Sequence, residues 1–150
     1  AAREVMGTAD CFICEADLYI SDLSIFDAEL SRSCYYGKMV PGFSDDWVFD
    51  WDGERITRVG KEGTDRYNMV GVSYFKKADA AVIRDAIDAA YEKPGYEGLY
   101  WDEIVDRQLD KLNLDIHPVE KEQIVEIDSV AELAVIDESY REVLEKMQAE

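Results

Sequence analysis

A strand-type segment runs directly into a helix-type segment near the middle of this 150-residue chain. Residues 66–75 are rich in aromatic and β-branched side chains, a composition that favours a β-strand. From Ala78 to Tyr91 the apolar residues recur at helical spacing and form one stripe, made of Val82, Ile83, Ala86, Ile87, Ala90 and Tyr91. A strand followed at once by an amphipathic helix predicts an α/β fold, in which the helix covers one face of a sheet.

Other segments complete this prediction. Short strands are expected at residues 11–14, 33–40, 47–51, 55–59, 114–119 and 123–127, and helices or helical turns at 22–30, at 99–112 and after Ser129. Pro41-Gly42 is expected to end the second of these strands, and Asp52-Gly53 predicts a hairpin turn. Because no repeat or linker interrupts the pattern, residues 1–150 are predicted to form a single α/β domain with a mixed β-sheet and flanking helices.

The acidic composition excludes some classes of function. The formal net charge of −18 argues against nucleic-acid binding, which needs basic patches for the phosphates. We find no apolar run long enough to cross a bilayer and no signal peptide, so we expect a cytoplasmic protein that does not bind membranes. With one histidine and three cysteines, the sequence also argues against a zinc site.

Two short acidic motifs lie near opposite ends of the chain, at residues 14–19 and 125–129. A capping box that begins at Ser129 places Asp128 between a strand and a helix, where open α/β sheets bind ligands. Asp17 follows its own strand in the same way. A small number of oxygen ligands suits Mg²⁺, and the pair is therefore a candidate metal site. Structural roles are the alternative: Asp128 would complement a helix dipole, and Asp17 would cap a loop.

Aromatic residues are concentrated between the two motifs: Tyr35, Tyr36, Trp47, Trp51, Tyr67, Tyr74, Tyr100 and Trp101. Aromatic faces attract quaternary ammonium groups, and a nearby acid such as Asp46 or Asp102 would strengthen that attraction. Aromatic residues at strand and helix spacing are also typical of a protein core. The sequence therefore leaves a choline-like pocket and a packed core as alternatives.

Five motifs occur in an order that resembles one enzyme family. They are Phe12–Tyr19, Asp46-Trp47, Met69–Phe75, Leu99–Asp102 and Val125–Ser129. In this order they resemble the bacterial choline-phosphate cytidylyltransferases, which have the Rossmann-like fold of nucleotide-diphospho-sugar transferases. The resemblance extends from about Ala9 to Tyr140 and corresponds to the C-terminal half of that family, its acceptor- and metal-binding part.

This resemblance implies Mg²⁺-dependent transfer of CMP from CTP to phosphocholine, giving CDP-choline and pyrophosphate. The family's catalytic, metal-binding aspartates correspond to Asp17 and Asp128. The same resemblance implies that the choline site is formed by Trp47, Tyr74, Tyr100, Trp101 and Asp102.

Two departures from the family affect this expectation. Leu18 stands where the family often has asparagine, and no Gly-rich, basic loop for the triphosphate is found in the sequence. We therefore expect the chain alone to bind nucleotide poorly. The alternatives are a sugar-phosphate acceptor, or a non-catalytic domain whose uncovered sheet would favour a homodimer.

Overall fold

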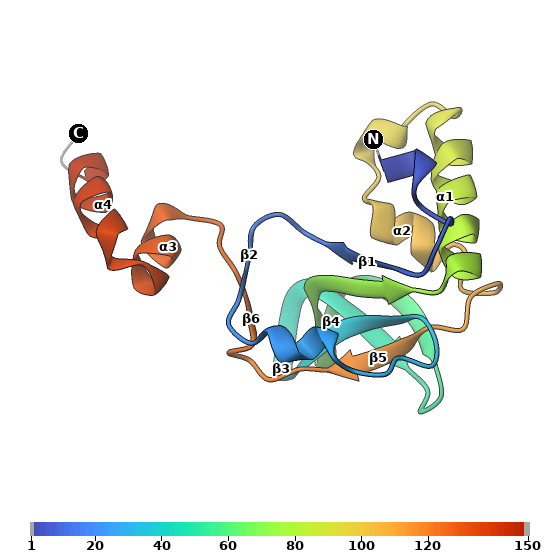
Figure 1. Ribbon diagram of the computed structural model, residues 1–150, viewed down its shortest axis with the longest axis horizontal. Coiled ribbons are helices and arrows are strands. Elements are labelled where there is room, and N and C mark those ends of the chain that lie inside the picture. Colours follow the sequence, from blue (N-terminus) through green and yellow to red (C-terminus); the bar gives the residue numbers. More distant parts are fainter. Residues whose placement is uncertain (1, 149–150) are drawn as a thin grey trace.

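The computed structural model describes residues 2–148 and contains a four-stranded sheet in the order β1-β4-β3-β5 (Figure 1). The strands are β1 (Cys11–Cys14), β3 (Cys34–Trp51), β4 (Ile56–Phe75) and β5 (Asp115–Pro118). Neighbours β1, β4 and β3 run antiparallel, whereas β3 and β5 are parallel. The predicted α/β fold with a mixed sheet is therefore confirmed.

Strands β3 and β4 form one long hairpin, which differs from the prediction of four short strands. Pro41-Gly42 does not end β3, because the pair lies at a bulge where the register shifts between Val40 and Phe43. Gly42 has φ +82°, and its amide donates a hydrogen bond to Asp65 Oδ1 over 2.8 Å. The predicted turn at Asp52-Gly53 is confirmed as the end of this hairpin.

Helices α1 (Lys77–Tyr91) and α2 (Trp101–Asp106) lie beside each other on one face of the sheet (Figure 1). Their apolar sides pack with the sheet into the larger core, whose fully buried members include Tyr35, Phe49, Phe75, Ile83, Val105 and Leu112. Helix α2 is shorter than the predicted 99–112, since hydrogen-bonded turns replace its last part. Those turns still bury Leu112, as the apolar pattern predicted.

A second, smaller core lies on the opposite face of the sheet. It contains Tyr36, Val70, Val72 and Ile124, together with Ile25 from a 3₁₀ helix. Two short strands, β2 (Leu18–Ile20) and β6 (Ile124–Glu126), pair antiparallel in a separate sheet beside it. Strand β2 was not predicted.

Helices α3 (Val130–Ile136) and α4 (Arg141–Gln148) pack on each other and extend away from the sheet (Figure 1). The predicted N-cap at Ser129 is confirmed, because Ser129 Oγ accepts a hydrogen bond from the Glu132 amide over 3.2 Å. The capping box differs from the prediction in its second bond, because Glu132 Oε2 accepts from the Asp128 amide over 2.9 Å and not from that of Ser129. Four 3₁₀ helices complete the described elements: η1 (Ala2–Glu4), η2 (Leu23–Phe26), η3 (Tyr96–Gly98) and η4 (Glu138–Tyr140). Within residues 2–148, no helix is both long and apolar enough to cross a membrane.

Candidate functional site

Three carboxylates converge where the two acidic motifs meet. Oxygen atoms of Glu15, Asp17 and Glu126 all lie within 4.8 Å of one another, and we call this group the acidic cluster. The pairing of β2 with β6 produces it: Leu18 stands opposite Glu126, and the Ile127 amide donates to the Asp17 carbonyl over 2.8 Å. Hydrogen bonds between the backbones of the two motifs thus hold the carboxylates together.

The acidic cluster is electrostatically crowded. Partial burial, followed by the charges of Asp17 and Asp46, raises the pKa of Glu15. The pKa of Glu126 is raised by partial burial and then by Asp128, Glu15 and the other nearby acids. Across the described part of the chain, no Lys or Arg forms an ion pair with any of the three cluster carboxylates. A bound cation would relieve this repulsion, and oxygen donors are the ligands that hard divalent cations prefer.

The structure places the two sequence-predicted aspartates differently. Asp17 is a member of the acidic cluster. Asp128 is exposed and is not one of its three residues, although its charge reaches Glu126. Sequence reasoning did not select Glu15 and Glu126, yet a signal was present. Each stands two residues before a selected aspartate, and that spacing puts both side chains on one side of an extended backbone.

Gly71 in β4 allows the chain to approach closely beneath the acidic cluster. Its carbonyl accepts a hydrogen bond from the Glu15 amide over 2.9 Å, and its φ is +73°. A Cβ atom at this position would lie 2.7 Å from Glu15 Oε2 and 2.9 Å from Leu18 Cδ2. The groups that approach Gly71 closely therefore belong to the chain itself.

The predicted aromatic residues do not form a single cage. The rings of Trp47 and Tyr100 lie edge to face with centroids 5.5 Å apart. Trp101 stacks on Tyr35 in the larger core at 6.1 Å. Tyr74 packs in the smaller core across the sheet, where its ring centroid is 5.0 Å from that of Phe12. The structure thus brings Trp47 and Tyr100 together and separates Tyr74 from them.

Asp102 is buried, with 4% of its surface exposed. Its Oδ1 accepts a hydrogen bond from the Tyr35 hydroxyl over 2.8 Å. Burial is the main cause that raises the pKa of Asp102 to about 7, and the charge of Glu15 adds to it. This carboxyl group therefore has a partner inside the larger core and is sensitive to the charge of the acidic cluster.

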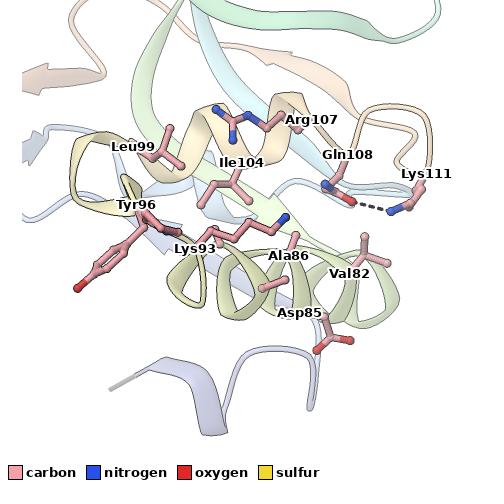
Figure 2. Close-up of a pocket in the computed structure, with 13 residues that line it drawn as sticks. Val82, Asp85, Ala86, Lys93, Tyr96, Leu99, Ile104, Arg107, Gln108 and Lys111 are labelled. Atoms are coloured by element: carbon pink, nitrogen blue, oxygen red, sulfur yellow. Dashed lines mark hydrogen bonds between the residues drawn. The ribbon is translucent and has the colours of Figure 1, made fainter.

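Two surface clefts border helix α2. One, of about 560 Å³, lies between α1 and α2 and combines apolar residues such as Val82 and Ile104 with the basic Lys93 and Lys111 (Figure 2). It contains none of the sequence-predicted site residues. The other, of about 540 Å³, is lined by the Trp47–Tyr100 pair and by Lys61, Glu103, Asp106 and Arg107.

Sequence comparison finds related cytidylyltransferases. The chain is 50% identical over 141 residues to 2-aminoethylphosphonate cytidylyltransferase of Lancefieldella rimae. The matched segment covers 93% of the chain and 57% of that protein. It is 26% identical over 131 residues to choline-phosphate cytidylyltransferase of Streptococcus pneumoniae. That match covers 87% of the chain and 57% of the relative. The chain thus spans somewhat more than half the length of each of these relatives. No family model matches it.

Comparison with solved structures identifies proteins that share the fold of this chain. The CTP:phosphocholine cytidylyltransferase of Streptococcus pneumoniae superposes with a TM-score of 0.77 at 24% identity, covering 93% of the chain and 60% of that structure. The inositol-1-phosphate CTP transferase of T. maritima gives a TM-score of 0.54 at 15% identity, covering 93% of the chain and 56% of that structure. These likenesses establish the nucleotidyltransferase fold over the part that the chain spans.

Proposed function

Because the chain is related in sequence to cytidylyltransferases and has the nucleotidyltransferase fold, we propose that it forms the metal- and acceptor-binding part of a cytidylyltransferase. The observation that carries the proposal is the acidic cluster, where carboxylates from both acidic motifs converge in a protein related in sequence to cytidylyltransferases. In the proposed reaction an acceptor oxygen attacks the α-phosphorus of CTP, and pyrophosphate leaves. The residues of this chain would position the acceptor for that attack.

We propose that the acidic cluster holds Mg²⁺ through Asp17, Glu15 and Glu126, with Asp128 as a further oxygen donor at its edge. The donor set fits this ion, because all four groups are carboxylates and Mg²⁺ prefers oxygen ligands. A bound Mg²⁺ would neutralise charge that develops on the phosphoryl group. Asp17 and Asp128 thus keep the role that the sequence resemblance implied, and two glutamates join them.

Replacing Gly71 with alanine is expected to weaken divalent-cation binding about tenfold, an effect typical of losing support for a metal ligand. The added Cβ overlaps Glu15 Oε2 and the Leu18 side chain, so Glu15 must move away. Gly42→Ala is the matched control, because Gly42 has a similar φ of +82° but no atom within 4 Å of an added Cβ. Both variants lose about 1 kcal/mol of stability from backbone strain.

Titration with Mn²⁺ and unfolding in urea separate the two effects. Only Gly71→Ala should change Mn²⁺ affinity, while both variants should unfold at similarly lowered urea concentrations. Equal Mn²⁺ affinity in the two variants would show that Glu15 does not depend on the space above Gly71.

For the acceptor, we propose 2-aminoethylphosphonate in place of the phosphocholine that the sequence resemblance implied. The support is the higher identity to the phosphonate enzyme, 50% against 26% for the choline-phosphate enzyme. Both acceptors combine an anionic phosphorus group with an ammonium group. Trp47 and Tyr100 would hold the ammonium through their ring faces. Trp101 and Asp102 would support this pair from the core, and Tyr74 has no part in it.

The acceptor proposal predicts that 2-aminoethylphosphonate binds at least about tenfold more tightly than phosphocholine in the presence of Mg²⁺. A site built for one substrate commonly discriminates against a bulkier analogue by this amount or more. Isothermal titration calorimetry of the chain with each compound measures the ratio. Phosphorus NMR of mixtures with CTP and Mg²⁺ then tests whether a cytidylylated product and pyrophosphate appear.

Two controls sharpen this measurement. Trp47→Ala should weaken both acceptors, whereas Trp51→Ala removes another tryptophan of the same strand that is absent from the cleft lining. Tighter binding of phosphocholine would restore the choline enzyme as the better assignment. If neither compound bound, the Trp47–Tyr100 pair would lose its proposed role.

A further inference from the structure

The Trp47–Tyr100 pair already holds a cation that belongs to the chain. The ammonium of Lys61 lies 5.6 Å from the ring centroid of Trp47 and 5.4 Å from that of Tyr100. Both distances are within the range of a cation–π contact. One ammonium group therefore lies close to both rings that line the cleft.

Strand register and helix position build this arrangement. Lys61 in β4 stands directly opposite Trp47 in β3, so its side chain leaves the sheet beside the indole. Tyr100 immediately precedes α2, and its amide donates to Glu103 Oε2 over 2.9 Å, which fixes the backbone there. Three separate elements thus meet around one ammonium group.

The remaining charges of the cleft do not draw Lys61 away from the rings. Glu103 and Asp106 also line the cleft, but neither forms an ion pair with Lys61 among the described residues. Asp106 Oδ1 instead accepts a hydrogen bond from the Val59 amide over 2.7 Å. The ring faces are therefore the close partners of the Lys61 ammonium.

We propose that Lys61 is a specificity-determining residue that occupies the ammonium position of the Trp47–Tyr100 pair and must leave it when an acceptor cation binds. This inference rests on the proposed role of the two rings in the acceptor site. The Lys61 head group is a primary ammonium, the same group that 2-aminoethylphosphonate carries. A trimethylammonium group is bulkier and gains its affinity from methyl contacts with ring faces, so it requires Lys61 to withdraw further from both rings than a primary ammonium does.

Removing the Lys61 side chain is expected to open the rings to quaternary ammonium. NMR titration with tetramethylammonium, followed on the indole N–H signal of Trp47, should show about three- to tenfold tighter binding to Lys61→Ala than to the parent protein. Arg107→Gln is the matched control, because it also removes one positive charge from the cleft lining without removing a ring contact. It should change the affinity less than about twofold. In the double variant Trp47→Ala/Lys61→Ala, followed on Tyr100 signals, the gain should disappear.

A separate NMR measurement tests whether Lys61 lies over the two rings. Ring currents should shift the ε-methylene protons of Lys61 upfield in the parent protein, and Trp47→Ala should abolish that shift. Equal gains for Lys61→Ala and Arg107→Gln would assign the effect to net charge and overturn the inference, as would no saturable binding to Lys61→Ala. The probe carries no phosphorus and needs neither CTP nor metal. A negative result here is thus distinct from a failure of the acidic cluster to bind Mn²⁺.

Discussion

Asp17→Asn is expected to weaken Mn²⁺ binding to the chain at least about tenfold and to lower any cytidylyl transfer by about 100-fold or more. Divalent-cation affinity depends strongly on the number of charged ligands, and Asp17 supplies one of three carboxylates within 4.8 Å. Metal stabilisation of a phosphoryl transition state is worth several kcal/mol, and each ~1.4 kcal/mol corresponds to a factor of ten in rate. Electron paramagnetic resonance of free Mn²⁺ measures the binding directly.

Stability and metal binding should change in opposite directions in this variant. Removing one of several repelling carboxylates relieves crowding, so Asp17→Asn should unfold at the same or a higher urea concentration without metal. Asp110→Asn is the control, because it makes the same chemical change at an exposed residue outside the cluster. Unchanged Mn²⁺ affinity in Asp17→Asn would exclude the acidic cluster as the metal site.

Companion variants resolve which carboxylates take part. Glu126→Gln should weaken Mn²⁺ binding about as much as Asp17→Asn, since both residues belong to the cluster. Asp128→Asn should have a smaller effect, because Asp128 is proposed as a donor at the edge of the site and is not one of the three converging carboxylates. If Asp128→Asn had the larger effect and Glu126→Gln none, the sequence-derived pair of aspartates would describe the site better than the cluster.

The fold could be predicted from sequence where periodicity was strong. Helix α1 and the turn at Gly53 were foreseen because apolar spacing and turn chemistry are local properties. The continuity of β3 and β4 was not, because it depends on contacts across the hairpin. Asp50, for example, forms ion pairs with Arg58 at 2.8 Å and Arg66 at 2.9 Å, and these residues stand 8 and 16 positions away.

The candidate site shows the same division between local and distant information. Asp17 could be selected because it follows a strand, a property of its own neighbourhood. The convergence of Glu15 with Glu126 depends on β2, which has three residues and is too short to show a period. The ring residues were selected by type, but which face of the sheet each one occupies follows from the strand register. Trp47 and Tyr74 accordingly pack in different cores.

Asp102→Asn is expected to stabilise the protein by up to a few kcal/mol at pH 8 and to have little effect at pH 4. Burial raises the pKa of Asp102 from the ordinary aspartate value of 3.8 to about 7 in the folded protein. Between pH 3.8 and about 7 the unfolded chain has released the Asp102 proton that the folded chain still holds, so the free energy of unfolding falls as the pH rises. Above pH 7 Asp102 is ionised in the folded protein as well, and the full free-energy cost of burying its charge lowers the stability. Asparagine keeps the oxygen that accepts from Tyr35 and never ionises.

Urea unfolding of the parent protein and Asp102→Asn at pH 4, 6 and 8 measures the difference, and the carboxyl ¹³C signal of Asp102 reports its titration directly. The difference in unfolding free energy should grow through this range, because only Asp102 is changed between the two proteins. Asp110→Asn is the control, because it makes the same chemical change at an exposed residue. A ¹³C titration midpoint near 4 for Asp102 would contradict the expectation.

Because Glu15 contributes to the raised pKa, adding Mg²⁺ should move the midpoint downward if the ion binds at the acidic cluster, and the buried carboxyl group would then report occupancy of the site.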